Sequence, residues 1–170
     1  SEVMLVLGDN LMHGNDFESH LKTAIGLMRI YGACVFAYPV KDPSRYGVVT
    51  LDGNKIVDIT EKPTDPKSNL AIPGLYFYNN EVVEIAKSVK PSERGELEIT
   101  DIHKTYLAGG KLAVCELSAG FAWLDMGTFD ALLGAACYVQ ALEERQGIKI
   151  GCIYEASKRN GWCNRVVKPQ

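Results

Sequence analysis

The stretch VMLVLGDN at residues 3–10 decides which fold this sequence predicts. The five consecutive apolar residues 3–7 lack the polar alternation of a half-exposed strand. They therefore predict a central parallel strand that is covered on both faces. Gly8 and Asp9 follow at the carboxyl end of this strand, where open α/β sheets bind their ligands. A carboxylate fixed there suits a hard cation such as Mg2+. The alternative is that Asp9 and Asn10 only cap a turn.

The composition narrows the class of protein. With 170 residues, of which 46% are hydrophobic and 23% are charged, the chain is large enough to bury the core of one domain. A formal net charge of -3 without a cluster of basic residues argues against nucleic acid as a partner. No apolar run approaches the roughly 18 residues that a membrane span needs, so a membrane protein is also not expected.

The cysteines and histidines argue against several kinds of site. The five cysteines form no CxxC pair, so they predict small buried apolar residues of a reducing compartment and hence a cytoplasmic protein. The three histidines show no HxH or HExxH spacing, which gives no support to zinc catalysis. The cysteines concerned are Cys34, Cys115, Cys137, Cys152 and Cys163.

Outward from the first strand, apolar periodicity and turn residues predict strands that alternate with helices. Residues 11–16 form a loop, Asn15 or Asp16 caps the first helix, and the strand at 33–40 is a second central strand that completes a βαβ unit. Further strands are expected at 48–51 and 55–60 (a hairpin around Asp52-Gly53), 70–78, 111–117 and 121–125, and helices at 17–30, 81–89, 97–107 and 129–145.

This order predicts one α/β domain over residues 1–170, with three layers in which helices flank a mixed, mostly parallel sheet. A short strand and a short helix are expected between residues 147 and 162, followed by a polar tail at 163–170. The chain opens with Ser-Glu and enters a central strand within two residues. We therefore expect a fold that is incomplete at its N-terminus, as in a piece of a longer protein.

Two turns between strands offer candidate binding residues. In the first, Gly47 permits close approach of a ligand and Tyr46 offers a ring and a hydroxyl; the alternative is a plain turn with an aromatic cover. In the second, Glu61 offers an acceptor for sugar hydroxyls and Lys62 a point charge for a phosphate, while Pro63 stiffens the turn. The alternative for this pair is an exposed ion pair of little energetic consequence.

Two later segments add charged candidates. Arg94 next to Gly95 can hold a phosphate with two parallel hydrogen bonds, while the acids that follow favour the start of a helix. Asp125 lies at a strand end beside a glycine, as Asp9 does, so the two carboxylates can converge on one cation that is bound mainly through substrate phosphates. The alternative is that Asp125 or Thr128 caps the long helix that follows.

Taken together, six motifs in this order and spacing resemble the glucose-1-phosphate thymidylyltransferase family, which belongs to the sugar nucleotidyltransferases. The motifs are LVLGDN, KDPSRYGVV, ITEKPTDPKSN, GLYFYNNEVVEIA, KPSERGELEITDI and FAWLDMGT, and the resemblance extends to about residue 162. It implies Mg2+-dependent transfer of dTMP from dTTP to glucose 1-phosphate, which gives dTDP-glucose and pyrophosphate. It also implies direct attack of the sugar phosphate oxygen on the α-phosphorus, without a covalent intermediate.

The resemblance also implies residue roles. Asp9 and Asp125 correspond to the Mg2+ ligands, and together with Lys62 and Arg94, which hold the sugar phosphate, they form the expected catalytic set. The expected substrate-binding set consists of Tyr46, Gly47, Glu61, Lys62, Ile72, Gly74, Tyr76, Arg94 and Trp123. Three residues depart from the family pattern: Pro73, Met126 and Phe129.

The family's Gly-rich nucleotide loop is not found in these 170 residues, and this leaves three hypotheses open. The chain is the sugar phosphate half of a thymidylyltransferase that is fully active only with the missing segment; or it is a sugar phosphate-binding or regulatory module; or it is an inactive relic. Because uncovered sheet edges favour pairing between chains, we also expect a homo-oligomer.

Overall fold

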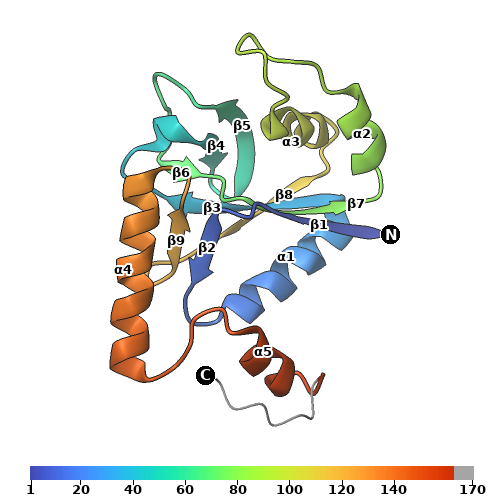
Figure 1. Ribbon diagram of the computed structural model, residues 1–170. Helices are drawn as coiled ribbons and strands as arrows, with labels where there is room; N and C mark the ends of the chain where they lie inside the picture. The colour runs from blue at the N-terminus through green and yellow to red at the C-terminus, as the bar shows by residue number, and fades with distance from the viewer. Residues whose placement is uncertain (163–170) are drawn as a thin grey trace. The chain divides into compact units, whose positions relative to one another are not determined.

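Strand β3 (Ala33–Pro39) lies at the centre of a seven-stranded sheet (Figure 1). Its first five residues are buried, and Val35 and Phe36 are 0% exposed. Apolar and aromatic residues suit such a doubly covered position. Antiparallel partners β7 (Leu75–Asn79) and β6 (Leu70–Ala71) flank it, and β8 (Leu112–Glu116) pairs with it in parallel. The prediction of a central strand at 33–40 is therefore confirmed.

The remaining strands extend the sheet on either side of β3. In this computed structural model, which describes residues 1–162, the strand order is β1-β7-β3-β6-β4-β5, and β8 pairs with β3 outside this path. The outer strands are β1 (Glu2–Val6), β4 (Gly47–Asp52) and β5 (Lys55–Glu61). The sheet is mixed, as predicted, but it is not mostly parallel. Among the described strands only β3 and β8 pair in parallel.

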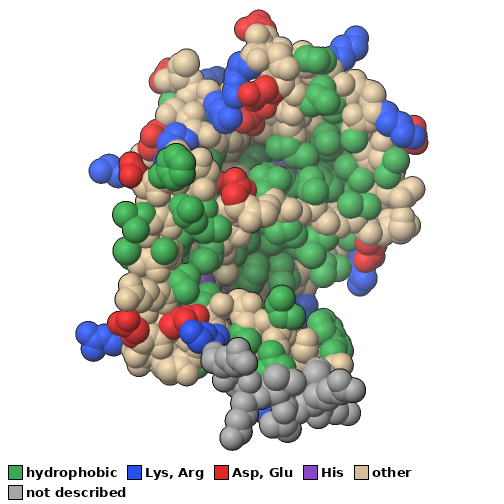
Figure 2. Space-filling view, in the orientation of Figure 1, with side chains coloured by type: hydrophobic (Ala, Val, Ile, Leu, Met, Phe, Trp, Pro, Cys, Tyr) green, Lys and Arg blue, Asp and Glu red, His purple; other side chains and the backbone are tan. Residues whose placement is uncertain are grey.

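Strand β1 is the main departure from the sequence prediction. It is an edge strand that pairs only with β7. Val3 packs against the core, but the next three apolar side chains are exposed, with Met4 at 59% and Val6 at 51%. Figure 2 shows hydrophobic side chains gathered on the face where Figure 1 places β1. Because β7 runs antiparallel between β1 and β3, the predicted βαβ unit does not join neighbouring parallel strands. An apolar run in the sequence therefore does not specify which strands lie beside it in the sheet.

Residues predicted as a loop form a strand instead. Strand β2 (Asn10–His13) pairs antiparallel with β9 (Ala122–Asp125) in a separate two-stranded sheet. The prediction of a loop at 11–16 was wrong over the first three of these residues because the partner strand lies more than a hundred residues later. A strand pairing of that kind is tertiary information that local turn residues do not contain.

Helices cover both faces of the large sheet, so the predicted three layers are confirmed (Figure 1). Helix α1 (Phe17–Tyr31) buries Ala24 and Met28 against one face. Helices α2 (Val82–Ser88) and α3 (Ile99–Ala108) pack their buried residues against the other. The predicted N-cap of α1 is only partly right, because Asp16 occupies the cap position in a left-handed conformation without a side-chain capping hydrogen bond.

Several local predictions are confirmed. Strands β4 and β5 form the hairpin around the Asp52-Gly53 turn, and Gly53 has the positive φ of 56° that this turn requires. The single strand predicted at 70–78 is instead divided into β6 and β7, and Pro73, which has no N–H donor, lies unpaired between them. A short 3-10 helix, η1 (Pro43–Arg45), precedes β4. The cysteines agree only in part, since Cys34 and Cys115 are buried but Cys137 is exposed.

The chain divides into two compact units, residues 1–125 and 126–170, and the second is described by itself. It contains α4 (Phe129–Gln146) and α5 (Ile153–Arg159), and Thr128 Oγ1 caps α4 by accepting from the backbone N–H of Ala131 at 3.2 Å. No strand forms between residue 147 and the last described residue, contrary to expectation. The predicted tail at 163–170, with Cys163, lies outside the described residues. That the whole chain is a single domain stays a prediction.

Among residues 1–162, no helix has both the length and the apolar character needed to cross a membrane.

Candidate active site

Two carboxylates that lie far apart in the sequence come together beside the small sheet. Asp9 lies on the turn between β1 and β2, and Asp125 is the last residue of β9. The β2–β9 register places Asn10 opposite Asp125, which brings the neighbouring Asp9 close to it. The pKa of Asp125 is raised, first by burial and then by the negative charge of Asp9. The two acids therefore lie close enough to repel one another.

Two cations face this acid pair. Arg45 Nη2 lies 3.9 Å from Asp125 Oδ2, and the Arg45 guanidinium lies 5.4 Å from the centre of the Tyr46 ring. Lys62 also lowers the pKa of Asp125 and opposes the effect of burial. The backbone of Lys62 has a positive φ of 39°, which is unusual for a residue with a side chain. A hydrogen bond of 2.9 Å from Lys62 N–H to the Tyr46 carbonyl oxygen holds this turn.

Gly47 leaves no room for a side chain beside two polar residues. A Cβ at this position would lie 2.8 Å from Thr100 Cγ2 and 3.3 Å from Glu61 Oε2. Three elements therefore meet at Gly47: the beginning of β4, the end of β5 and the first turn of α3. Thr100 is 1% exposed, and its hydroxyl lies close enough to the Glu61 carboxyl to lower the pKa of that group. A carboxylate held in this way can accept a hydrogen bond from a hydroxyl of a ligand.

Glu61 is held in an environment that disfavours its charge. Burial raises the pKa of this carboxyl, and the nearby Glu98 carboxylate raises it further. The Thr100 hydroxyl, Lys62 and Arg94 partly offset both effects. Such a partly buried carboxylate with cations close by is suited to accept hydrogen bonds from a polar ligand.

Arg94 lies on the same side as Glu61 but already has acidic partners. Its Nη2 lies 2.7 Å from Glu96 Oε2 and its Nη1 lies 3.7 Å from Glu98 Oε1. The side chain is 42% exposed. Because Arg94 still lowers the pKa of Glu61, the guanidinium lies within electrostatic reach of that carboxylate. The structure therefore brings Arg94 near Glu61, and its role as a phosphate ligand stays a prediction.

Aromatic and aliphatic residues form the floor and wall of the region. Tyr76 is 3% exposed, and the charges of both Glu61 and Asp9 add to the effect of burial in raising its pKa. The Tyr46 and Trp123 rings lie 4.9 Å apart. Tyr76 is thus the buried residue that connects the two acidic clusters. The remaining predicted lining residues, Ile72 and Gly74, are buried in the turn before β7.

The donor set fits a divalent metal that is held in part by a ligand. Two carboxylate groups repel one another at Asp9 and Asp125, and a cation between them would relieve this repulsion. No group of three or more His, Cys, Asp or Glu residues suited to a metal occurs among residues 1–162. A cation held here therefore takes its other ligands from water or from a bound molecule, which is typical of Mg2+ with phosphates.

Sequence reasoning missed three polar residues of this region. Asn10 makes hydrogen bonds to several parts of the site, Thr100 faces Gly47, and Glu98 acts on Glu61. Each of these residues lies in a motif that the sequence analysis singled out. Asn10 follows Asp9 in the GDN motif, and Glu98 and Thr100 belong to the ELEITDI segment. Without the fold, however, these acids and hydroxyls are not distinguishable from caps and solvated side chains.

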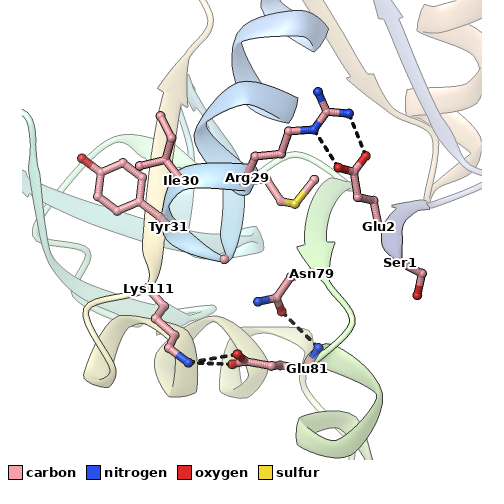
Figure 3. Close-up of a pocket in the computed structure, with 10 residues that line it drawn as sticks. Ser1, Glu2, Arg29, Ile30, Tyr31, Asn79, Glu81 and Lys111 are labelled. Atoms are coloured by element: carbon pink, nitrogen blue, oxygen red, sulfur yellow. Dashed lines mark hydrogen bonds and ion pairs between the residues drawn. The ribbon is translucent and has the colours of Figure 1, made fainter.

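Two cavities in the described part of the chain lie apart from this region. A cavity of about 540 Å³ lies where β1 begins and β7 ends, and Figure 3 shows its charged side chains paired with one another: Arg29 with Glu2, and Lys111 with Glu81. A second cavity, of about 700 Å³, lies along β8 and is lined mainly by apolar side chains. Neither contains a predicted site residue.

Comparison with protein families gives a match to the family described as nucleotidyl transferase over residues 1–141. A glucose-1-phosphate thymidylyltransferase of Neisseria meningitidis is 51% identical over 161 residues, which are 94% of this chain and 55% of that protein. A glucose-1-phosphate thymidylyltransferase of Mycobacterium tuberculosis is 50% identical over 161 residues, which are again 94% of this chain and 55% of that protein. The chain thus spans about half the length of these relatives.

Solved structures give the same result for the fold. A Bacillus anthracis protein assigned as a glucose-1-phosphate thymidylyltransferase, in complex with a sucrose, matches with a TM-score of 0.67 and 37% identity over 81% of this chain and 54% of that one. A UDP-glucose pyrophosphorylase in complex with UDP-glucose matches with a TM-score of 0.70 and 27% identity over 82% of this chain and 57% of that one. The predicted α/β class is confirmed.

Proposed function

Because the chain belongs to the nucleotidyl transferase family, we propose that it carries the sugar phosphate half of a glucose-1-phosphate thymidylyltransferase site. The reaction is transfer of dTMP from dTTP to glucose 1-phosphate, with dTDP-glucose and pyrophosphate as products. The observation that carries the proposal is the convergence of Asp9, Asp125 and Lys62, which come from three separate strand ends.

The acceptor binds through residues whose geometry suits it. Glu61 hydrogen-bonds a hydroxyl of the glucose ring beside Gly47, where a Cβ would collide with Thr100 and crowd the Glu61 carboxylate. Tyr46, Tyr76 and Trp123 supply apolar surface around the ring, together with Ile72 and Gly74. This combination of one carboxylate and several aromatic side chains is typical of a site that binds a small polar ligand.

The phosphate of glucose 1-phosphate binds to Lys62 and Arg94. Lys62 acts as a point charge between the acid pair and Glu61, and Arg94 exchanges its exposed contact with Glu96 for the phosphate oxygens. By holding the phosphate in this place, the two cations aim its oxygen for attack on the α-phosphorus of the nucleotide. In this proposal catalysis comes from positioning and charge neutralisation, without a covalent intermediate.

Asp9 and Asp125 hold Mg2+ in this proposal. When bound, Mg2+ neutralises the charge of the phosphates on which the reaction depends. The raised pKa of Asp125 has a direct consequence for binding, because a protonated carboxyl is a poor metal ligand. Affinity for the metal is therefore expected to fall as the pH drops toward the pKa of Asp125, which lies above the ordinary value of 3.8.

Full activity requires the nucleotide half of the site, which the 170 residues do not supply. The alternatives are a sugar phosphate-binding or regulatory module and an inactive relic. We also expect the chain to form a homo-oligomer, supported by the exposed apolar edge of β1, and to be cytoplasmic, supported by the free thiols of the four described cysteines.

The proposal is tested by titrating the chain with glucose 1-phosphate and following its thermal unfolding. At a ligand concentration 100 times the dissociation constant, binding adds about 2.7 kcal/mol to the unfolding free energy. Replacing Lys62→Ala together with Arg94→Ala is expected to abolish this stabilisation. The matched control, Lys55→Ala with Lys104→Ala, removes two cations elsewhere and leaves it unchanged. Equal stabilisation of both double variants would contradict the sugar phosphate site.

A pyrophosphate-release assay with dTTP, glucose 1-phosphate and Mg2+ separates the alternatives. We expect no useful rate from the chain alone, and activity from a chimaera that adds the unmatched part of the Neisseria meningitidis relative. Binding without activity in both proteins favours a binding module. Activity of the chain alone would contradict the need for the nucleotide half.

A further inference from the structure

Asn10 has a role in this site that its sequence position does not reveal. Its side-chain Oδ1 accepts a hydrogen bond from Trp123 Nε1–H at 2.6 Å and another from the backbone N–H of Gly74 at 3.0 Å. Its Nδ2 donates to Asp9 Oδ1 at 2.9 Å. One amide group thus connects the turn after β1, the turn before β7 and strand β9.

The hydrogen bonds show what kind of role this is. An amide oxygen has two lone pairs, and both are engaged by Trp123 and Gly74. Asn10 therefore has no acceptor left for a metal ion or a sugar hydroxyl without breaking one of these bonds. Its amide orients other residues and does not bind the ligand through this oxygen.

Each partner of Asn10 belongs to a different part of the proposed site. Asp9 is one of the two carboxylates, Gly74 lies in the buried turn before Tyr76, and the Trp123 ring contacts Tyr46. The backbone adds a fourth connection, because Asn10 pairs with Asp125 between β2 and β9. The partners lie 64 and 113 positions away from Asn10 in the sequence, so no local element could hold them together.

The turn that contains Gly74 has little freedom to compensate. A Cβ on Gly74 would lie 2.8 Å from the Leu7 side chain, and the Leu7 N–H donates to the Gly74 carbonyl at 2.9 Å. This turn is therefore packed directly on the segment that leads to Asp9. A change in the Asn10 amide is therefore transmitted both to the acid pair and to the buried segment around Gly74.

We propose that Asn10 is a positioning residue that sets the Asp9 carboxylate, the Gly74 turn and Trp123 in one geometry. This inference rests on the proposed function, because it is the sugar phosphate and metal site that the geometry serves. Outer hydrogen-bond partners of metal ligands commonly change metal affinity 10- to 100-fold when they are removed. Without the amide, Asp9 can turn away from Asp125, and each loop can relax independently.

The test uses Mn2+ as a probe in the presence of glucose 1-phosphate, measured by loss of the free Mn2+ resonance signal on the whole chain. Asn10→Ala is expected to weaken Mn2+ binding roughly 10- to 100-fold, at a temperature where the variant is fully folded. The control Asn54→Ala removes an amide from the hairpin turn and leaves the affinity unchanged. A purely structural role would lower the unfolding temperature but not the affinity of the folded protein.

A second readout does not depend on any ligand. The sequence contains two tryptophans, so the indole N–H resonance of Trp123 is readily assigned in a ¹⁵N-labelled sample. In Asn10→Ala this resonance and the Gly74 amide should shift and exchange faster with solvent. In Asn10→Asp the slow solvent exchange of both groups should be retained, because a carboxylate still accepts the two hydrogen bonds. Mn2+ binding should nevertheless weaken, because this variant loses the donor to Asp9 and places two carboxylates against each other.

A third variant covers the case in which Asn10→Ala does not fold. Trp123→Phe removes the indole donor and is expected to weaken Mn2+ binding, although a tryptophan ring carries no metal ligand. If Asn10→Ala and Trp123→Phe both bind Mn2+ as tightly as the wild type, the positioning role of Asn10 is overturned but the proposed function is not. A wild-type chain that binds neither Mn2+ nor glucose 1-phosphate would overturn the proposed function, and the role of Asn10 with it.

Discussion

Strands β1 and β3 have the same kind of sequence but different surroundings. Each contains an uninterrupted apolar run, and each is expected from this run to be a central strand. Strand β3 has partners on both sides and helices over both faces, so Val35 is 0% exposed. Strand β1 has one partner, so Val6 is 51% exposed. The apolar run thus specifies a strand, whereas burial depends on what lies beside it.

The largest effect is expected from a matched pair of valine substitutions. Val35→Ala in β3 removes two buried methyl groups and leaves a cavity, so it should lower the unfolding free energy by about 2–3 kcal/mol. Val6→Ala in β1 should cost less than about 1 kcal/mol because half of that side chain already contacts water. Urea unfolding of both variants measures the difference, and equal losses would contradict the exposure of β1.

A buried histidine tests how well the α3 face of the sheet is covered. His103 is 0% exposed, its Nε2 lies 2.7 Å from the Tyr78 hydroxyl, and burial lowers its pKa to about 3 from the ordinary 6.5. The unfolded chain binds a proton near pH 6.5, whereas the folded chain does not until about pH 3. The unfolding free energy should therefore fall as the pH drops through this window, by up to about 1.4 kcal/mol per pH unit.

The control for this measurement is His103→Gln, which does not titrate. The difference in unfolding free energy between wild type and variant should shrink as the pH falls from 7 toward 4. Carboxylates elsewhere titrate in both proteins and cancel in this difference. A difference that stays constant with pH would show that His103 can take up its proton in the folded state, and that this face is open to water.

The open edge of β1 predicts a smaller effect, on association. Leu5→Lys places a charge on a strand that is exposed along one edge, and edge charges oppose pairing between chains. Light scattering should then give a lower mass than for the wild type, approaching one chain of 18.7 kDa. The control Ile30→Lys changes an exposed residue of α1 and should leave the mass unchanged. A wild-type mass of one chain would contradict self-association altogether.

The smallest effect is expected at the start of β1, where Arg29 makes two hydrogen bonds to Glu2. Both side chains are exposed, so water and salt screen the pair and the ordering of two long side chains opposes it. Arg29→Ala should leave the urea midpoint unchanged within error. A clear loss of stability would mean that this pair anchors β1, and that the strand depends on more than its ladder with β7.

Local patterns predicted most of the elements. The helix at residues 17–30, the hairpin around Asp52-Gly53 and the long helix after Thr128 are confirmed, because each depends on periodicity, turn residues or a cap within a few positions. The errors in the order and pairing of the strands have a common cause. The position of β1, the strand β2 and the antiparallel β7 all depend on partners far away in the sequence.

The candidate site divides in the same way. The sequence by itself determined the carboxylates, cations and glycines that are available, and the motifs from which Asp9, Glu61, Lys62, Arg94 and Asp125 could be selected. Only the tertiary structure decided that Asn10 connects Asp9 with Trp123 and Gly74, and that Thr100 faces Gly47. The physical reason is that hydrogen bonds and van der Waals contacts act over a few ångströms in space. The sequence records order along the chain, and the fold determines which distant residues come within that range.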